Sequence, residues 1–271
     1  METPDIRLIA ADMDGTLLDS AKRMPAGMFE RIRALRARGI HFVAASGRQY
    51  YDLLRNFPGM EDDMLFLAEN GAMVVGERKV LYFSELPYEQ LAAPVHLVRT
   101  LPEAHAILCG AESAYYEGDV PVLRENAQMY YARLQHVPDV LEAAKHDHIC
   151  KIAVFRASTI EEDVYPALKR FEGAFQVVLS GDSWVDLMLP DVNKGSAMRQ
   201  LQQRLGLTPD QCMAFGDYLN DLELMQSVTH SYGMANGHPD LLAVSRYRAP
   251  SNDESGVARV LDELFFGDPA D

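Results

Sequence analysis

The sequence predicts an α/β protein in which a parallel-sheet domain is interrupted by an inserted α+β module. Near the start of the chain, short apolar runs alternate with a helical pattern, which is typical of strand–helix–strand units. From about residue 84 to residue 189 the candidate strands lie closer together, which favours an antiparallel sheet. A length of 271 residues is enough for one large domain or two smaller ones. We therefore expect a discontinuous core of residues 1–83 and 190–271 around a module of residues 84–189.

The first predicted elements are two buried strands joined by a helix. Ile6–Ala11 is a short apolar run that ends at an acidic turn, as a strand buried on both faces would. Met24–Arg38 carries apolar residues at helical spacing and stops before Gly39, a residue type common just past helix ends. Ile40–Ala45 predicts a second strand. This order implies a right-handed parallel unit.

A hairpin and the inserted module follow. Leu65–Leu67 and Ala72–Val75 flank the dipeptide Asn70-Gly71, a strong hairpin signal, and Val80–Phe83 predicts a further strand. Pro190–Asn193 is a plausible connection back to the core. The candidate strands of the module are His105–Cys109, Ala114–Glu117, Lys151–Phe155, Phe175–Leu179 and Trp184–Leu189.

The second core segment repeats the pattern of an apolar strand that ends in an acidic turn. Lys194–Leu205 predicts a helix, Cys212–Phe215 predicts a strand, and Asp217 follows that strand. Short elements then continue to a last helical stretch, Val257–Phe265. Because ligands bind at the carboxyl ends of the strands in open parallel sheets, the two acidic turns are candidates for one site.

Composition narrows the possible partners. Lys and Arg total 25 against 40 Asp and Glu, and the formal charge of −15 argues against general binding to nucleic acid or anionic membrane. A small anionic substrate stays possible, because a bound divalent cation reverses the local potential. No apolar run approaches the roughly 20 residues that span a bilayer, and the polar start, Met1–Asp5, lacks the features of a signal peptide. We therefore expect a cytoplasmic protein, with its three cysteines, Cys109, Cys150 and Cys212, as buried reduced thiols.

Asp12 and Asp14 form the most suggestive pair of side chains. They are two residues apart at a strand end, so an extended backbone would point both the same way, and Gly15 permits a tight turn after them. Two adjacent carboxylates repel unless one is protonated or a cation joins them. Mg²⁺ suits such a site because it prefers oxygen ligands. The alternative is an acidic turn that only ends a strand.

Other candidate residues stand beside predicted strand and helix ends. Ser46-Gly47 would present a hydroxyl and free backbone N–H groups at a helix N-terminus, an anion site, although Ser46 could be only a helix cap. Asp217 could likewise be only a cap, and Lys194 only a surface lysine. Their order along the chain favours a shared functional site over separate caps and surface residues. The order is an acidic pair, a hydroxyl, a lysine and a second acidic turn.

Together these segments resemble the haloacid-dehalogenase-like hydrolase superfamily, and specifically the Cof-type phosphatases of its subfamily IIB. The resemblance covers nearly the whole chain and implies a Rossmann-like core with a cap domain. It is carried by four motifs and two further segments: Asp12–Leu17, Ser46–Arg48, Asn193–Gly195, Gly216–Asp221, Glu69–Ala72 and Ser251–Ala258.

The resemblance implies a role for each motif. Asp12 would attack phosphorus and become a phosphoaspartate, and Asp14 would act as general acid and base. Mg²⁺ would be held by Asp12, Asp217 and the backbone carbonyl of Asp14. The phosphoryl oxygens would be bound by Ser46, by Lys194 and by backbone amides near Met13, Asp14 and Gly47.

The remaining residues carry weaker expectations. Asn220 and Asp221 would orient Lys194 or a metal-bound water. Arg48 would contact the phosphate or the leaving group, or else form a surface salt bridge. Asn70 would contact substrate, or be only a hairpin residue. The stretch Gly233–Gly237 departs from the family's usual Met-Gly-Asn-Ala, which leaves the contribution of Asn236 open.

By the same resemblance, the inserted module would be a cap that selects the leaving group. The polar and aromatic candidates in it are Tyr115, Tyr116, Lys151, Asp182 and Trp184, any of which could simply pack the sheet. The expected substrate is a small phosphorylated metabolite, with sugar phosphates favoured, and no protein partner is inferred. Two alternatives stay open: a phosphomutase that uses the same aspartyl-phosphate, and a regulatory binding protein without turnover.

Overall fold

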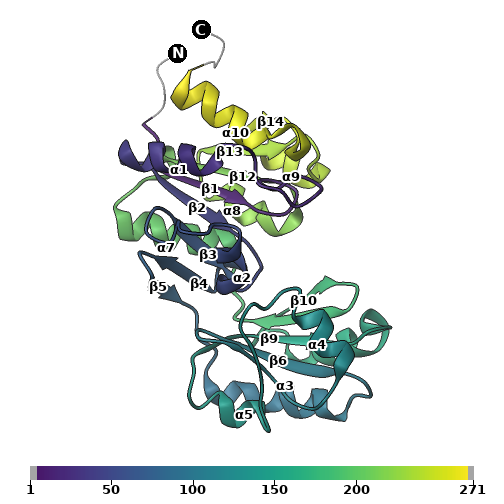
Figure 1. Ribbon diagram of the computed structural model, residues 1–271. Coiled ribbons are helices and arrows are strands. Elements are labelled where there is room, and N and C mark those ends of the chain that lie inside the picture. Colours follow the sequence, from purple (N-terminus) through teal and green to yellow (C-terminus); the bar gives the residue numbers. More distant parts are fainter. Residues whose placement is uncertain (1–4, 268–271) are drawn as a thin grey trace. The chain divides into compact units, whose positions relative to one another are not determined.

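Two β-sheets organise the chain, one in each of two units (Figure 1). The computed structural model describes residues 5–267. The core unit runs to Tyr82 and resumes at Asn193, and the inserted unit comprises Phe83–Val192. Most of the polar start considered above, Met1–Pro4, lies outside the described residues. Across the part of the chain that is described, no helix has both the length and the apolar character needed to span a bilayer.

The sheet of the core unit has the predicted parallel arrangement. Its strand order is β14-β13-β12-β1-β2-β3-β4-β5 within the described residues, and the neighbours from β14 to β3 pair in parallel. β3 and β4 pair antiparallel across Asn70-Gly71, so the predicted hairpin is confirmed. The strands are β1 (Leu8–Asp12), β2 (His41–Ala45), β3 (Leu65–Ala68), β4 (Met73–Gly76), β5 (Lys79–Phe83), β12 (Cys212–Gly216), β13 (His230–Met234) and β14 (Tyr247–Ala249).

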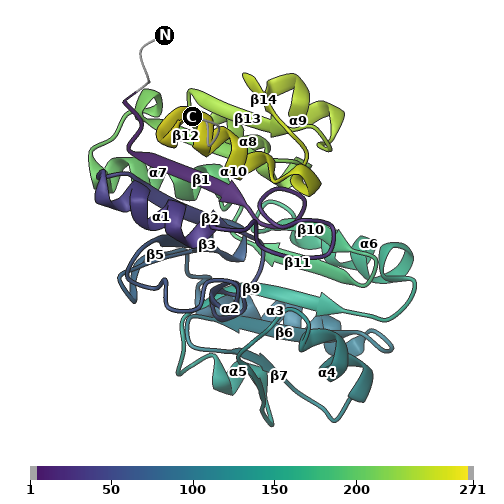
Figure 2. The same cartoon turned by 45° about the horizontal axis from the view of Figure 1, so that its top comes forward.

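Helices cover both faces of this sheet, which explains why its strands are almost entirely apolar (Figure 2). One face packs on α7, α8 and α9 through a buried cluster that includes Leu8, Val43 and Leu201. Figure 2 shows α1 and α10 on the other face, in front of β1. The helices are α1 (Met28–Ala37), α2 (Tyr50–Arg55), α7 (Lys194–Leu205), α8 (Leu222–Gln226), α9 (Pro239–Val244) and α10 (Gly256–Leu261).

Short helical turns fill several connections of the core unit. They lie next to strands or helices in the chain. The turns are η1 (Glu69–Gly71), η4 (Pro209–Gln211), η5 (Leu219–Asp221), η6 (Asn252–Glu254) and η7 (Asp262–Phe266).

Two helix predictions had different outcomes. α7 has the predicted bounds because both ends carry local signals: Asn193 and Ser196 form a capping box, and Gly206 adopts a left-handed φ of 67° after the last turn. The predicted start of the first helix at Met24 is wrong. Gly27 has a φ of 70°, which a right-handed helix does not allow, so α1 begins at Met28.

The inserted unit contains the predicted α+β module. Its strand order is β10-β11-β9-β6-β7-β8 among the described residues, and the pairs from β10 to β7 are antiparallel. The expected antiparallel sheet has one exception, at the edge where β7 and β8 run parallel. The long connection that contains the helix α4 (Pro121–Ala127) lies between them, as a parallel pairing requires. The strands are β6 (His105–Gly110), β7 (Ala114–Tyr116), β8 (Leu134–His136), β9 (Ile149–Phe155), β10 (Gln176–Gly181) and β11 (Trp184–Met188).

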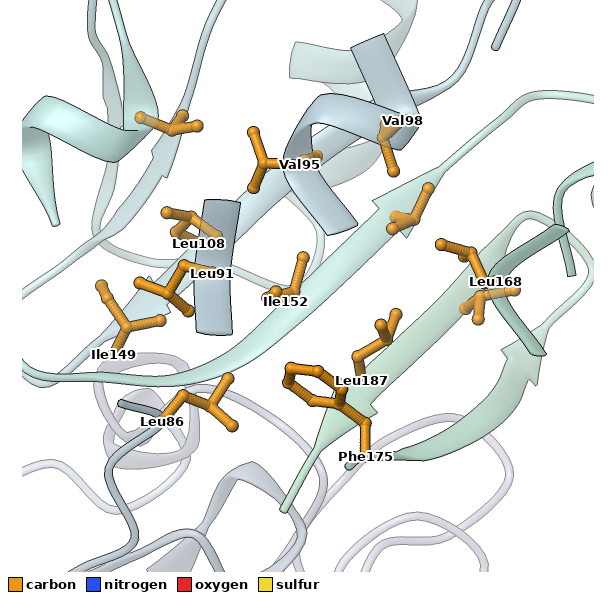
Figure 3. Close-up of a cluster of buried hydrophobic side chains, with 14 of the residues drawn as sticks. Leu86, Leu91, Val95, Val98, Leu108, Ile149, Ile152, Leu168, Phe175 and Leu187 are labelled. Carbon is orange, nitrogen blue, oxygen red and sulfur yellow. The ribbon is translucent and has the colours of Figure 1, made fainter. Parts of the chain in front are cut away.

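A hydrophobic cluster of its own stabilises the inserted unit. Side chains of α3 such as Leu91 and Val95 pack on Leu108, Ile152 and other residues of the sheet (Figure 3). The helices and turns of the unit are α3 (Tyr88–Thr100), α4 (Pro121–Ala127), α5 (Val140–Ala143), η2 (Ile160–Val164), α6 (Tyr165–Leu168) and η3 (Lys169–Phe171). Across the two units all three cysteines are buried and unbridged, as predicted.

Candidate active site

Strand register brings the predicted acidic turns to one edge of the core sheet. Asp12 ends β1 and lies opposite Ala45, the last residue of β2, so Ser46 begins the neighbouring loop. On the other side of β1, Ala11 pairs with Phe215, and Asp217 follows the end of β12. The separate motifs of the sequence therefore converge at the carboxyl ends of three adjacent strands.

Lys194 is the buried cation at this edge. Its side chain is fully buried, and Nζ donates to Asp12 Oδ1 at 2.5 Å and to Asp221 Oδ1 at 2.6 Å. Burial by itself would lower the pKa of Lys194, but the two carboxylates outweigh it and raise that pKa. Lys194 is therefore a charged lysine in the interior, and the interpretation as a surface lysine is wrong.

Three carboxylates surround this lysine. Asp12, Asp217 and Asp221 each offer an oxygen, and these oxygens lie within 4.8 Å of one another. Burial, and next the charge of Asp221, raises the pKa of Asp12 well above its usual range, although Lys194 opposes this. Burial also raises the pKa of Asp217. One lysine does not balance the repulsion of two buried carboxylates and a half-buried one, so the cluster has the chemistry of a site that could hold a divalent cation.

The three carboxylates differ in how many oxygens are already bonded. Both oxygens of Asp221 accept hydrogen bonds, Oδ1 from Lys194 and Oδ2 from the backbone N–H of Asp217 at 3.1 Å. Asp217 Oδ1 accepts from Thr16 Oγ1 at 2.6 Å. Asp221 therefore fixes both Lys194 and the loop after β12, whereas Asp12 accepts from Lys194 and Asp217 accepts from Thr16 through one oxygen each.

Gly15 allows the loop after β1 to approach this cluster. Its φ is +88°, and a Cβ built on it would lie 2.4 Å from Asp217 Oδ2. Asn236 Nδ2 donates to the Gly15 carbonyl at 2.8 Å, and Asn236 Oδ1 accepts from the backbone N–H of Asn252 at 3.0 Å. The contribution of Asn236, left open by the sequence, is thus a bond to the loop that follows the nucleophile candidate.

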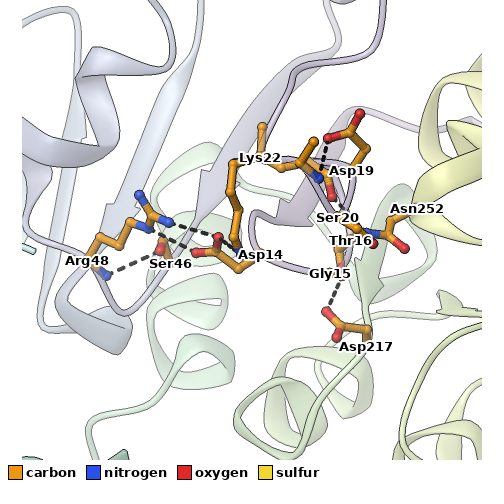
Figure 4. Close-up of polar contacts among 12 residues, drawn as sticks. Asp14, Gly15, Thr16, Asp19, Ser20, Lys22, Ser46, Arg48, Asp217 and Asn252 are labelled. Atoms are coloured by element: carbon orange, nitrogen blue, oxygen red, sulfur yellow. Dashed lines mark hydrogen bonds and ion pairs between the residues drawn. The ribbon is translucent and has the colours of Figure 1, made fainter. Parts of the chain in front are cut away.

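The side chain of Asp14 points away from the cluster of Asp12, Asp217 and Asp221. Figure 4 shows its carboxylate directed at Arg48 and Lys22, away from Asp217. The expectation of one extended backbone across Asp12 and Asp14 is wrong, because β1 ends at Asp12. Burial alone would raise the pKa of Asp14, but hydrogen bonds from Lys22 and Arg48 outweigh it and lower that pKa. Nothing in the sequence pattern singled out Lys22.

The loop after β2 carries Ser46 and Gly47. Ser46 is buried, and its hydroxyl accepts from the backbone N–H of Arg48 at 3.2 Å. The expected place of Ser46 at a helix N-terminus is wrong, because α2 begins at Tyr50. A Cβ on Gly47 would lie 2.9 Å from Asn70 Oδ1, so the hairpin residue Asn70 packs against this loop.

The other predicted residues are placed as follows. Met13 is buried directly after β1. Asn220 is exposed, and Lys194 donates its hydrogen bonds to Asp12 and Asp221.

The candidates in the inserted unit have structural contacts of their own. Lys151 and Asp186 are both buried, with Nζ and Oδ2 3.7 Å apart. The ring of Trp184 packs on Phe155 with centroids 4.9 Å apart. Tyr115 Oη donates to an Asp147 carboxylate at 3.0 Å. In the same unit, the ring of Tyr116 lies 5.2 Å from that of His136, and Asp182 is exposed.

The core sheet carries a cluster of carboxylates and a buried lysine at the carboxyl ends of its strands, and comparison with known proteins identifies the family. The family model described as haloacid dehalogenase-like hydrolase matches residues 9–261. The chain belongs to this family, and its relatives make it a phosphatase. The resemblance inferred from the motifs is confirmed.

Three relatives illustrate the range of similarity. The 5-amino-6-(5-phospho-D-ribitylamino)uracil phosphatase YbjI of Escherichia coli strain K12 is 36% identical over 267 residues, which is 96% of each chain. The crystal structure of SMU.1108c from Streptococcus mutans UA159 has 29% identity and a TM-score of 0.82, and the match covers 97% of this chain and 100% of that one. The subclass IIB sugar phosphatase BT4131 shares the fold at 18% identity, with a TM-score of 0.77 over 95% and 98% of the two chains.

Proposed function

We propose that this protein is a Mg²⁺-dependent phosphatase that hydrolyses a small phosphorylated metabolite through a phosphoaspartate on Asp12. The observation that carries the proposal is the buried cluster in which Lys194 bonds to Asp12 while Asp217 and Asp221 lie beside them. A nucleophilic carboxylate next to fixed positive charge is what phosphoryl transfer to an aspartate requires.

In the first step, one oxygen of Asp12 forms a bond to phosphorus, and the bond from phosphorus to the ester oxygen breaks. Lys194 restrains Asp12 by bonding Oδ1. Asp14 gives a proton to the departing oxygen. In the second step, water attacks the phosphoaspartate while Asp14 takes up a proton, which releases inorganic phosphate and restores the Asp12 carboxylate.

The metal would be held by Asp12, by Asp217 and by the backbone carbonyl of Asp14. When bound, Mg²⁺ supplies positive charge that neutralises the phosphoryl oxygens. The pKa values of Asp12 and Asp217 are raised first by burial and then by the charges of neighbouring carboxylates, and a bound cation would stabilise the ionised form of both. Thr16 keeps Asp217 oriented through its hydrogen bond to Oδ1.

The transferred phosphate would be bound by Ser46, by Lys194 and by backbone amides at Met13 and Gly47. Ser46 and Lys194 are buried at the same sheet edge, which supports the assignment. Asp221 acts on Lys194, since its Oδ1 accepts the second hydrogen bond from Nζ.

A phosphorylated sugar or sugar alcohol is the proposed substrate class. The relative with 36% identity over nearly its whole length acts, by its name, on a phosphoribityl compound, and the structural relative BT4131 is named a sugar phosphatase. We also propose that the inserted unit selects the leaving group, as the resemblance implies for the insertion between the second and third motifs.

Hydrolysis assays test the proposal. With Mg²⁺, the wild type should release phosphate from p-nitrophenyl phosphate and from members of a sugar-phosphate panel, and a chelator should abolish the release. Asp12→Asn should be inactive, whereas Asp62→Asn, a change at an exposed carboxylate of the same unit, should match the wild type. An inactive wild type across the panel, or an active Asp12→Asn, refutes the mechanism.

The same assays separate the alternatives. Phosphate release without a bisphosphate activator excludes a phosphomutase. Absence of turnover combined with binding of phosphorylated metabolites would favour a regulatory binding protein.

A further inference from the structure

Asp14 is clamped between two cations that the mechanism above does not use. Arg48 donates to both of its oxygens, from Nε at 2.9 Å and from Nη2 at 2.8 Å. Lys22 Nζ donates to Asp14 Oδ1 at 2.8 Å (Figure 4). The forked contact with Arg48 is the geometry that a guanidinium also uses for phosphate. In this structure the carboxylate of Asp14 thus occupies a site that fits an external anion.

Arg48 is held in place independently of Asp14. Its third donor, Nη1, reaches Asp52 Oδ2 at 3.3 Å, and the side chain of Asp52 is only 8% exposed. Asp52 lies one turn further along the chain, in α2, where it is fixed by the helix. If Asp14 moved away, Asp52 would keep the guanidinium in position with Nε and Nη2 available.

Lys22 is presented by a closed loop. Its backbone has a φ of 61°, and its N–H donates to the Asp19 carbonyl at 2.8 Å. The Asp19 carboxylate accepts from the backbone N–H groups of Ala21 and Arg23. Because the loop is tied by its own bonds, the backbone that carries Lys22 is held in place without Asp14.

We propose that Arg48 and Lys22 form a latch that holds Asp14 in the substrate-free enzyme, and that the anionic phosphate ester competes for these cations and releases Asp14 for proton transfer. Arg48 and Lys22 act as positioning residues for Asp14. The inference rests on the proposed function, in which Asp14 serves the departing oxygen. It adds a coupling between anion binding and the freedom of that carboxyl group.

Competition has a thermodynamic consequence that does not require turnover. If Asp14 and an anion share the same donors, removing the charge of Asp14 must tighten anion binding. We expect Asp14→Asn to bind inorganic phosphate about tenfold more tightly than the wild type, measured by calorimetry in the presence of Mg²⁺. Asp14→Ser is a second variant that removes the charge if Asp14→Asn does not fold.

A double-mutant cycle separates competition from general electrostatic repulsion. The gain in phosphate affinity caused by Asp14→Asn should disappear when Arg48→Gln is added, because the shared donors are gone. It should persist when Arg55→Gln is added instead. Arg55 is the matched control, since it lies on α2 and contacts Asp52 at 3.5 Å without bonding Asp14.

Two results would overturn the latch. One is that Asp14→Asn binds phosphate no more tightly than the wild type. The other is that Asp14→Asn increases phosphate affinity equally with and without Arg48. Because phosphate binding is measured rather than hydrolysis, these results are distinct from a failure of the phosphatase mechanism. If the enzyme hydrolyses the panel but its phosphate affinity shows no coupling between Asp14 and Arg48, the proposed function stands and the latch is refuted.

Discussion

Replacing Lys194 by Met tests whether this residue is the counter-ion of the site. The substitution keeps the length of the side chain and removes the charge between Asp12 and Asp221. Lys194 is fully buried and the side chains of its two partners are 9% and 0% exposed, so solvent screens these pairs little. Removing one partner of such a buried pair costs about 3–5 kcal/mol.

That loss would be a large share of the roughly 5–15 kcal/mol that stabilises a typical folded protein. It corresponds to a fall of about 10 °C in the melting temperature, taking about 2–4 °C per kcal/mol for a protein of this size class. The loss should be smaller with Mg²⁺ than with a chelator, because the cation replaces part of the missing positive charge.

Urea and thermal unfolding, followed by circular dichroism, provide the measurement. Arg204→Met is the matched control, because Arg204 is an exposed residue in the last turn of the same helix, α7. It should change the free energy of unfolding by no more than about 0.5 kcal/mol. If Lys194→Met and Arg204→Met were equally stable in the chelator, Lys194 would not neutralise the buried carboxylates and the argument for the cluster would fail.

Three further substitutions probe other parts of the structure. Gly15→Ala would place a methyl group where only 2.4 Å separates it from Asp217 Oδ2, so it should weaken Mg²⁺ binding by about tenfold or more in calorimetry, and unchanged affinity would contradict this. Gly195→Ala would bring a Cβ to 2.2 Å from a backbone oxygen of α8, so it should cost about 2 kcal/mol in urea unfolding, and a neutral result would show that the two helices can separate. Arg99→Gln should destabilise the inserted unit by about 1 kcal/mol at neutral pH, because Arg99 donates two hydrogen bonds of 2.7 Å to Glu117 in a partly exposed pair. Arg99 lowers the pKa of Glu117 in the folded state, so this stabilisation is present above the unfolded pKa and is lost as the pH falls through the folded one. The melting temperatures of wild type and Arg99→Gln should therefore converge as the pH falls through the lowered pKa of Glu117, and a constant difference down to low pH would refute the pairing.

Local signals explain which elements could be predicted. The helix Lys194–Leu205 was predicted to the residue because a cap and a glycine mark its ends. The sequence does not predict β8, Leu134–His136, because the strand is three residues long and largely polar. Its extended conformation is stabilised by pairing with β7. The start of α1 was placed too early because apolar spacing does not reveal the left-handed backbone at Gly27.

The sequence by itself determined the class of the protein. Motifs that follow apolar runs in a fixed order were enough to indicate a parallel sheet with carboxylates at its edge, because strand ends and turns are specified by nearby residues. The family, the hairpin at Asn70-Gly71 and the candidates Asp12, Ser46, Lys194 and Asp217 all came from such local patterns.

Only the tertiary structure decided how these groups are paired. Lys194 meets Asp12 across 182 positions of sequence, and Arg48 meets Asp14 across 34. The sequence assigned Asp14 to the same face as Asp12, whereas the fold turns it to Arg48 and Lys22. Hydrogen-bond partners of charged side chains depend on distances between distant segments, and burial sets their pKa values, so neither follows from local pattern.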